Sequence, residues 1–280
     1  MTGTPKISMI AYPTIDPVML AVGPIQIRWY GMMYVLGFAA AYLLVLYQAK
    51  RFHWQQIVDR LDDLHLFLII GVVIGGRLGY VLFYNLSYYL AHPLAIPALW
   101  TGGMSFHGGC LGAILAGVLC CRRMGLNFWK AADLFIVAVP IGLFFGRLGN
   151  FINGELFGRI TTVPWGMIFP EGGPLPRHPS QLYEALLEGL TLFAILWAIK
   201  AKPWQQASSS RWPHGSVLIL FLGLYGCVRF LVEFVREPDP QIGLIGSALS
   251  MGQLLCLVMI IVAPLLWWWR CRQTAKGGTR

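Results

Sequence analysis

Long apolar segments alternate with short polar ones along almost the whole chain, and this pattern predicts the architecture. A membrane-spanning helix needs roughly 20 mainly apolar residues. Seven windows meet this requirement, at about residues 21–47, 64–84, 98–120, 131–148, 182–200, 215–235 and 248–269. We therefore expect an all-α integral membrane protein with seven transmembrane helices.

The composition supports this class and suggests the domain organisation. Of the 280 residues, 57% are hydrophobic and 12% are charged, whereas a soluble globular domain is typically about 25% charged. The composition thus excludes a soluble protein. We expect a single polytopic membrane domain over residues 1–280, with small extracytoplasmic segments and one outer loop at about 149–181.

The N-terminal segment does not have the pattern of a cleavable signal peptide. Residues 1–17 lack a basic start followed by an apolar stretch, and Pro5, Pro13 and Pro17 interrupt them. We expect this segment to lie at the membrane interface, before the first helix.

Lysine and arginine are distributed unequally between the two sides of the predicted helices. When the connecting segments are assigned alternately to two sides, one side holds Lys50, Arg51, Arg60, Arg122, Arg123, Lys130, Lys200, Lys202, Arg211, Arg270, Arg272, Lys276 and Arg280, and the other holds Lys6, Arg159, Arg177 and Arg236. Excess Lys and Arg mark the cytoplasmic side. The N-terminus is therefore expected outside and the C-terminus in the cytoplasm. This distribution also argues against nucleic acid as the reason for the net charge of +9.

The cysteines give no sign of a metal site. The six of them show no metal-ligand spacing and fall mostly inside predicted helices or at cytoplasmic ends, where small apolar packing is their ordinary role. The sequence also has no phosphate-binding loop. We expect neither a metal nor a soluble cofactor.

Polar side chains inside the predicted helices gather in the outer half of the bilayer. At about 1.5 Å per residue, Arg77 and Arg229 lie about 9–10 Å below the outer helix ends, and Tyr30 and His107 about 13 Å below them. Arg147 lies at the outer end of the fourth helix. Charges inside a membrane usually face a cavity and mark a substrate path.

The sixth predicted helix carries the clearest local pattern. Tyr225, Arg229 and Glu233 are spaced by four and share one face. In one interpretation Arg229 and Glu233 neutralise each other while Tyr225 packs. In the other, Arg229 and Arg147 converge on an anionic ligand, because a forked guanidinium suits phosphate. A phospholipid head group is the anion most available at that depth.

A polar, glycine-rich stretch follows the fourth apolar window. This stretch, GRLGNFINGELFG at 146–158, contains Arg147, Asn150, Asn153 and Glu155. Each polar group costs energy at membrane depth unless something binds it. GRLG also occurs at 76–79, which leaves an internal duplication open.

Two further stretches contain candidate site residues. In TGGMSFHGG at 101–109, glycines leave room for a substrate beside His107, whose neutral ring can act as a general base; a packed core histidine is the alternative. In RHPSQLYE at 177–184, Ser180 is placed to cap the fifth helix. Glu184 and Glu188 continue one face of that helix and are placed to orient the arginines.

Taken together, these stretches resemble the bacterial prolipoprotein diacylglyceryl transferase family. The resemblance rests on GRLGNFINGELFG and, in order along the chain, on RWYGMMY at 28–34, GGRLGYVLFYN at 75–85, GGMSFHGG at 102–109, RHPSQLYE at 177–184, the Tyr225/Arg229/Glu233 stripe and SMGQ at 250–253. It spans nearly the whole chain. Residues 159–176 are less characteristic.

The resemblance implies a reaction and a location. The diacylglyceryl group of phosphatidylglycerol would be transferred to the lipobox cysteine of an exported prolipoprotein, with release of glycerol phosphate, as the first step of bacterial lipoprotein maturation. The protein would lie in the bacterial cytoplasmic (inner) membrane, with its site in the periplasmic half. The nucleophile would belong to the substrate, so none of the six cysteines needs a catalytic setting.

The resemblance also implies roles for particular residues. The expected catalytic residues are His107, Arg147, Arg229 and Tyr30. The expected ligands of phosphatidylglycerol are Arg147, Arg229, Asn150, Gly158 and Arg77. The expected supporting residues are Glu155, Glu233, Tyr225, Asn153, Gly154 and His178. Among these, Glu155 and Glu233 are expected to orient the arginines.

Two other classes of function remain open at this point. A transporter or flippase for an anionic lipid would also need buried arginines, but its polar groups should continue toward the cytoplasmic side. A structural or assembly protein would use the same arginines only as ion pairs. Formation of a thioether product distinguishes the enzyme from both.

Overall fold

The structure is a computed structural model, and it describes residues 10–23, 25–205, 212–237, 244–245 and 249–277. Residues 1–9 of the predicted interfacial segment, with Lys6, and the counted residues Arg211 and Arg280 lie outside this part. The chain divides into a short unit, Tyr42–Leu134, and a long unit, Met1–Ala41 with Phe135–Arg280.

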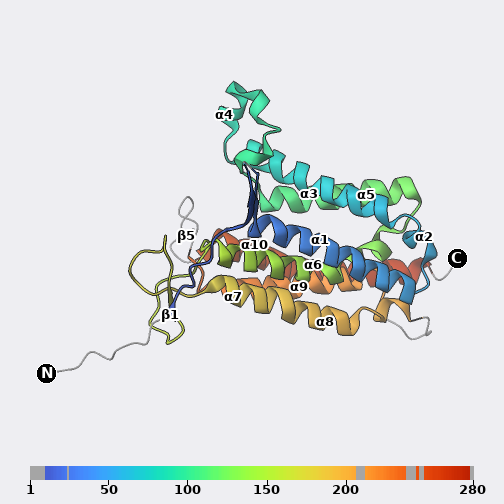
Figure 1. Cartoon of the computed structure of the whole chain (residues 1–280). Coiled ribbons are helices and arrows are strands. Elements are labelled where there is room, and N and C mark those ends of the chain that lie inside the picture. Colours follow the sequence, from blue (N-terminus) through green and yellow to red (C-terminus); the bar gives the residue numbers. More distant parts are fainter. Residues whose placement is uncertain (1–9, 24, 206–211, 238–243, 246–248, 278–280) are drawn as a thin grey trace. The chain divides into compact units, whose positions relative to one another are not determined.

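The short unit is built on two helices with glycines at their interface. Helix α3 (Leu61–Phe83) packs along α5 (Phe106–Met124) (Figure 1). A Cβ atom on Gly79 would lie 2.8 Å from the Cα atom of Gly108, and one on Gly75 would lie 2.7 Å from that of Gly112. Small residues therefore let the two backbones approach closely, as is usual between membrane helices.

The unit also contains the end of α1 (Trp29–Arg51), the start of α6 (Phe128–Ile152) and four short helical segments. The short segments are α2 (Gln55–Val58), α4 (Leu86–Ala91), η1 (Pro93–Ala95) and η2 (Leu99–Thr101). Helix α5 begins after Ser105, whose hydroxyl accepts a hydrogen bond from the Gly108 N–H at 3.2 Å, and this satisfies one of the free donors of the first turn. It ends at Gly125, which has a φ of +67°.

The long unit holds the other helices. They are most of α6 (Phe128–Ile152), the first half of α1 (Trp29–Arg51), a continuous helical run of α7 (Ser180–Glu184), η3 (Ala185–Thr191) and α8 (Leu192–Ile199), and then η4 (Lys202–Trp204), α9 (Ser216–Val232) and α10 (Met251–Gly277). The buried side chains of Val137, Leu196 and Val217 join α6, α8 and α9 in one apolar core. This core supports the polar groups at one end of the same helices.

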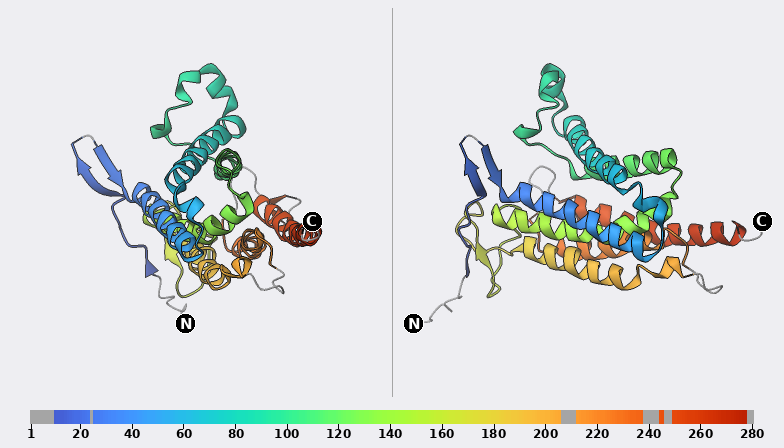
Figure 2. Two further views of the ribbon diagram at one scale, coloured as in Figure 1. Left: turned by 90° about the vertical axis from the view of Figure 1, so that its right-hand side faces the viewer. Right: turned by 45° about the vertical axis from the view of Figure 1, so that its right-hand side comes forward.

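Three short strand pairs adjoin the helices of the long unit. Strands β2 (Val18–Val22) and β3 (Ile25–Arg28) form an antiparallel hairpin directly before α1, drawn as blue arrows in Figure 2. The other pairs are β1 (Ile10–Ala11) with β4 (Met167–Ile168), in parallel, and β5 (Leu244–Ile245) with β6 (Leu249–Ser250), antiparallel. The β1–β4 pair ties the N-terminal segment to the predicted outer loop.

The mostly helical class is confirmed, and each of the seven predicted windows overlaps a helix. In the described part of the chain, five helical spans are long and apolar enough to cross a membrane: Trp29–Arg51, Leu61–Phe83, Phe128–Ile152, Ser180–Trp204 and Met251–Thr274. Helix α9 is apolar but shorter. The chain is therefore a multi-pass membrane protein with at least these five candidate spans.

Two predicted helix starts were wrong. Residues 21–22 and 25–28 belong to strands β2 and β3 instead of the first helix, and residues 98–105 precede α5. In the second case Gly102 and Gly103 have φ angles of +78° and +83°, a conformation that a right-handed helix cannot contain.

Candidate functional site

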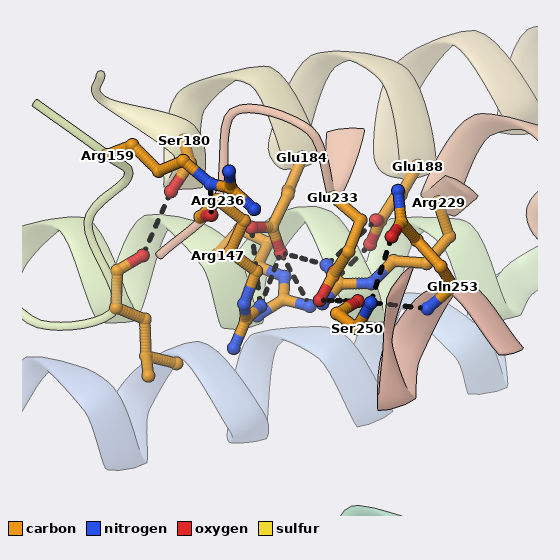
Figure 3. Close-up of polar contacts among 11 residues, drawn as sticks. Arg147, Arg159, Ser180, Glu184, Glu188, Arg229, Glu233, Arg236, Ser250 and Gln253 are labelled. Carbon is orange, nitrogen blue, oxygen red and sulfur yellow. Dashed lines mark hydrogen bonds and ion pairs between the residues drawn. The ribbon is translucent and has the colours of Figure 1, made fainter. Parts of the chain in front are cut away.

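Three arginines and three glutamates lie together in the long unit, as Figure 3 shows. We call them the arginine–glutamate cluster. The cluster consists of Arg147 from α6, Glu184 and Glu188 from the α7–η3 run, and Arg229, Glu233 and Arg236 from α9 and the turn after it. The arginine side chains are only 14–21% exposed, and Glu184 and Glu188 are fully buried.

Glu184 is the centre of the cluster. Its Oε2 atom lies 2.7 Å from Nη2 of Arg147 and 2.9 Å from Nη1 of Arg229. The same oxygen lies 3.4 Å from Nη1 of Arg236. One carboxylate thus connects arginines from two helices and a turn, and it fixes where their guanidinium groups can lie.

Glu188 is held less closely. Its Oε1 atom accepts a hydrogen bond from Nη1 of Arg229 at 3.3 Å, and its Oε2 atom lies 3.6 Å from Nη2 of Arg147. Among the described residues, this Oε2 atom has no hydrogen-bond partner although it is fully buried. The prediction that Glu184 and Glu188 face the arginines is confirmed.

Helical spacing explains why these residues meet. Arg229 and Glu233 are four residues apart, and Nη2 of Arg229 lies 3.0 Å from Oε2 of Glu233. Glu184 and Glu188 are also four residues apart, at the point where α7 continues into the wider π-helical turn η3. Such turns are frequent at functional sites. Gly189 in this turn lets α6 approach, since a Cβ there would lie 2.7 Å from Cβ of Phe144.

The SMGQ stretch anchors Glu233 by capping α10. The Ser250 hydroxyl accepts a hydrogen bond from the Gln253 N–H at 3.1 Å, and the Gln253 side chain accepts one from the Ser250 N–H at 3.0 Å. This reciprocal pair is a capping box. The Ser250 hydroxyl also donates to Oε1 of Glu233 at 3.0 Å (Figure 3). The S-x-x-Q spacing was the signal in the sequence, and it was missed as a cap.

Within GRLGNFINGELFG, the polar residues form a closed turn at the end of α6. The amides of Asn150 and Asn153 donate to Oε1 of Glu155 at 2.9 and 3.2 Å. Gly154, which lies between Asn153 and Glu155, has a φ of +68°, which glycine adopts at little cost. The expectation that Glu155 orients the arginines is not met among the described residues, because its carboxylate is held by the two asparagines. Glutamates 184 and 188 take that role.

The two predicted tyrosines lie beside these groups. Tyr30 at the start of α1 packs on Gly149, where a Cβ would lie 2.9 Å from Cδ2 of the tyrosine ring. Its hydroxyl lies 3.2 Å from that of Tyr34 and within interaction range of Asn150 and Glu155. Tyr225 is buried on α9 and interacts with the charges of Arg147, Glu188 and their neighbours.

The rest of the segment from 149 to 181 is tied to the turn after α9. The Arg159 N–H donates to the carbonyl of Val235 at 2.8 Å, and its Nε atom donates to the carbonyl of Arg236 at 2.9 Å. Gly158 lies where these two chain segments meet, and a Cβ on it would lie 2.8 Å from Cβ of His178. Gly158 is therefore needed for close backbone packing; its expected contact with lipid stays a prediction.

Ser180 does not cap the fifth helix, so that prediction was wrong. The cap position is occupied by Pro179, and no side chain accepts a bond there. The Ser180 hydroxyl instead donates to the carbonyl of Leu156 at 3.0 Å (Figure 3). The neighbouring Gln181 donates to the carbonyl of Glu155 at 2.6 Å. Both bonds hold the polar turn against the helix that carries Glu184.

His178 also lies in this region. Its Nδ1 atom is 3.2 Å from the hydroxyl of Tyr183, which accepts a hydrogen bond from Nε1 of Trp165 at 2.6 Å. Partial burial lowers the pKa of His178 below its ordinary value, because desolvation disfavours the charged ring. The neutral form is thus favoured in the folded protein.

Arg77, an expected lipid ligand, belongs to the short unit and is used there in a different way. Its guanidinium is buried and donates to five carbonyls of the loop between α4 and α5, with a sixth, longer contact to a hydroxyl. These partners are the carbonyls of Ala95, Ile96, Ala98, Gly102 and Gly103 and the hydroxyl of Thr101. Arg77 therefore holds this loop together, and its contacts leave little capacity for an anion.

His107 also belongs to the short unit, in the first turn of α5. Its side chain is exposed, so the alternative of a packed core histidine is wrong. The structure therefore gathers Tyr30, Arg147, Asn150, Glu233 and Tyr225 with their neighbours in one unit. His107 and Arg77 lie in the other unit, and their expected roles at the site stay predictions.

Arg236 is the cluster residue that sequence reasoning placed elsewhere, as an ordinary outer charge. It lies in the turn after α9, which ends at Val232, so helical spacing in the sequence gave no signal for it. The complete cluster contains three positive and three negative groups. Arg147 uses only Nη2 for its carboxylate contacts among the described residues, so Nη1 and Nε can bind an anion.

Comparisons with known proteins show the family of this chain. The sequence model of the family described as prolipoprotein diacylglyceryl transferase matches residues 17–269. A protein of Desulfotalea psychrophila is 54% identical over 96% of this chain and 98% of its own length. One from Geobacter sulfurreducens is 55% identical over 90% and 94%, and one from Pseudomonas aeruginosa is 51% identical over 95% and 98%. All three carry the name phosphatidylglycerol–prolipoprotein diacylglyceryl transferase.

Proposed function

Since this chain belongs to the prolipoprotein diacylglyceryl transferase family, we propose that it carries out the reaction for which its relatives are named. It transfers the diacylglyceryl group of phosphatidylglycerol to the thiol of a prolipoprotein's lipobox cysteine and releases glycerol phosphate. The observation that carries this proposal is the arginine–glutamate cluster, which presents buried guanidinium groups in a membrane protein.

The anion of the substrate accounts for the cluster. A guanidinium group offers five N–H donors in a fork that matches phosphate. Among the described residues, the carboxylate contacts of Arg147 use only Nη2, and its side chain is 17% exposed. We assign Arg147 and Arg229 to the phosphate of phosphatidylglycerol, with Glu184 and Glu188 fixing their orientation.

The reaction then proceeds by displacement at carbon. The sulfur of the prolipoprotein thiol attacks the carbon of the diacylglyceryl unit that bears the phosphate. The bond between this carbon and the phosphate oxygen breaks, and glycerol phosphate leaves with the bonding electrons. Negative charge grows on the leaving oxygens, and Arg147 and Arg229 stabilise it. We assign removal of the thiol proton to His107, because the thiolate is the attacking form.

Other residues shape the head-group site. Tyr30 and Asn150 lie beside the end of α6 that carries Arg147, and we assign them to positioning the lipid head group. Gly154 and Gly158 keep the polar turn compact, so that the head-group site stays accessible. Glu233, fixed by Ser250, holds the second side of Arg229.

The proposal also covers the topology and the location in the membrane. We propose seven transmembrane helices with the N-terminus outside and the C-terminus in the cytoplasm, all in one membrane domain over residues 1–280. The supporting argument is the positive-inside distribution of Lys and Arg. The site then lies on the periplasmic side of the bacterial inner membrane, where the segment from 149 to 181 carries the signature residues.

Mass spectrometry of a lipobox peptide tests this function. The purified protein is incubated with the peptide and phosphatidylglycerol, alongside the Arg147→Ala variant and the matched exposed variant Arg272→Ala. We expect a diacylglyceryl mass gain on the peptide cysteine with the wild type and with Arg272→Ala. We expect the gain to fall at least ~100-fold with Arg147→Ala.

The same experiment separates the competing classes of function. If folded wild-type protein gives no mass gain but moves phosphatidylglycerol between the leaflets of a vesicle, the cluster is a translocation site. If neither product nor transport is seen, the cluster has the role of a structural ion-pair network.

A further inference from the structure

The arginine–glutamate cluster is electrically balanced before any substrate arrives. Three arginines face three glutamates, so the cluster has no net charge when all six groups are ionised. A phosphodiester head group adds one negative charge. An uncompensated charge in a buried site is strongly unfavourable, so binding of the anion calls for a compensating change.

We propose that Glu188 supplies this change by taking up one proton when the anionic head group binds. The inference rests on the proposed function, because it takes the head group of phosphatidylglycerol as the anion. No covalent bond is made or broken. A proton from solvent adds to Oε2 of Glu188, and the cluster with its bound anion returns to zero net charge.

Geometry singles out Glu188 among the three glutamates. Glu184 has arginine nitrogens at 2.7 and 2.9 Å, and Glu233 has one at 3.0 Å and the Ser250 hydroxyl at 3.0 Å. The nearest arginine nitrogens to Glu188 are at 3.3 and 3.6 Å. Glu188 is therefore the carboxylate whose ionised form is stabilised least.

The free oxygen of Glu188 gives the proton a place. Its Oε2 atom is fully buried and has no hydrogen-bond partner among the described residues. A buried carboxylate oxygen without a donor is costly. Oε2 of Glu233 also lacks a hydrogen bond, but the Arg229 nitrogen at 3.0 Å compensates its charge. With Oε2 of Glu188 protonated, Oε1 still accepts from Arg229.

The surroundings of Glu188 favour the same residue. The charged or titratable groups that face it are Glu184 on its own helical run, Arg147 on α6, Arg229 and Tyr225 on α9, and Cys256 on α10. Once phosphate occupies the free donors of Arg147 and Arg229, both cations serve an additional anion. Their hold on Glu188 weakens, while the repulsion from Glu184 remains.

Calorimetry of lipid binding tests the proposal without turnover. The full-length protein in neutral detergent is titrated with phosphatidylglycerol, with no acceptor peptide present, in two buffers of different ionisation enthalpy. The difference between the two heats gives the number of protons bound. We expect on the order of one proton taken up per lipid, and an apparent Kd that rises by up to tenfold per pH unit toward alkaline pH.

Variants assign the proton to a residue. Glu188→Gln keeps an oxygen that accepts from Arg229 but cannot ionise, so its binding should take up no proton and show a Kd independent of pH. The control Glu171→Gln removes an exposed carboxylate in the outer segment and should behave as wild type. If Glu188→Gln does not fold, infrared difference spectra of wild-type protein with ¹³C-labelled glutamate should show a new carboxylic acid band on lipid binding.

Each outcome decides a separate question. Tight binding by the wild type with no proton uptake overturns the proposal and leaves the proposed function intact. Uptake that persists in Glu188→Gln overturns the assignment to Glu188. A wild type that binds no phosphatidylglycerol overturns the anion site itself, and with it the proposed function.

Discussion

The tetrapeptide GRLG occurs twice in this chain, and its arginine has a different role each time. In the short unit, Arg77 is 3% exposed and its guanidinium donates to backbone carbonyls of a single loop. In the long unit, the Arg147 side chain is 17% exposed and contacts the carboxylates of Glu184 and Glu188. Identical local sequence thus gives a loop clamp in one place and a candidate anion site in the other.

The partners of the two arginines explain this difference. The donors of Arg77 bind uncharged carbonyl groups of a loop. Arg77 therefore holds the loop in place and has few donors left for another ligand. Among the described residues, the carboxylates that face Arg147 engage one of its nitrogens and leave the other two available. What makes an arginine a binding group is therefore the number of its donors that remain free, which the surrounding elements determine.

Removing the centre of the cluster should have the largest effect. In Glu184→Gln, three arginines lose their shared carboxylate, and the cluster gains a buried positive charge. Breaking a buried ion pair from one side costs about 3–5 kcal/mol, and misplaced guanidinium groups should lower transfer at least ~100-fold. Thermal unfolding in detergent and the peptide assay measure the two effects. Glu237→Gln, on a half-exposed partner of Arg177, is the matched control, and an equal loss there would refute the central role of Glu184.

Exchanging both GRLG arginines for methionine sharpens the comparison. Arg77→Met leaves several loop carbonyls without a donor, and we expect a loss of about 2–4 kcal/mol in the free energy of unfolding. Binding of phosphatidylglycerol by the folded fraction should change less than about twofold. Arg147→Met should show the reverse order, with lipid binding lost and a smaller change in stability. If Arg77→Met abolished lipid binding while stability held, Arg77 would be a ligand as the sequence suggested.

Regular spacing is what made part of this structure predictable. The apolar windows located the helices, and spacing by four located Arg229 with Glu233 and Glu184 with Glu188, because residues one turn apart share a helix face. The boundaries were less predictable. Because Gly102 and Gly103 have positive φ angles, α5 begins only after them. The sequence does not reveal which backbone angles a glycine adopts.

Contacts between a side chain and a distant backbone were not predictable. Every residue has a carbonyl, so nothing in the sequence marked those that Arg77 and Ser180 bind. The partner of Glu155 depended on a turn at Gly154 that brings two asparagine amides onto one oxygen. Arg236 reaches Glu184 only because the chain turns back after α9. The fold sets these partners, and sequence spacing cannot.

The glycines of the two GRLG stretches provide a smaller test of the same difference. Gly79→Ala would bring a methyl group 2.8 Å from Cα of Gly108 in α5, and we expect a loss of about 1–3 kcal/mol from overpacking. In the described part of the chain, no packing neighbour lies within 4 Å of the position that a Cβ atom on Gly146 would take. Gly146→Ala should therefore raise stability by about 0.5–1 kcal/mol, as expected for alanine in place of glycine within a helix. Thermal unfolding of both variants decides this, and a destabilised Gly146→Ala would show that the long unit packs as tightly there as the short one.

The smallest expected effect is a pH dependence of stability, which should arise from His178 in the long unit. Burial lowers the pKa of this ring from 6.5 in the folded state, so the unfolded chain binds more protons between the two pKa values. Stability is therefore complete above about pH 6.5 and falls as the pH drops below it. Because the ring is only partly buried, we expect the Tm to fall by only about 1–2 °C. His178→Gln should remove this part of the acid sensitivity, whereas His92→Gln, at an exposed histidine of the short unit, should leave it unchanged. An unchanged acid slope in His178→Gln would mean that the neutral ring contributes nothing to the packing of the segment from 149 to 181.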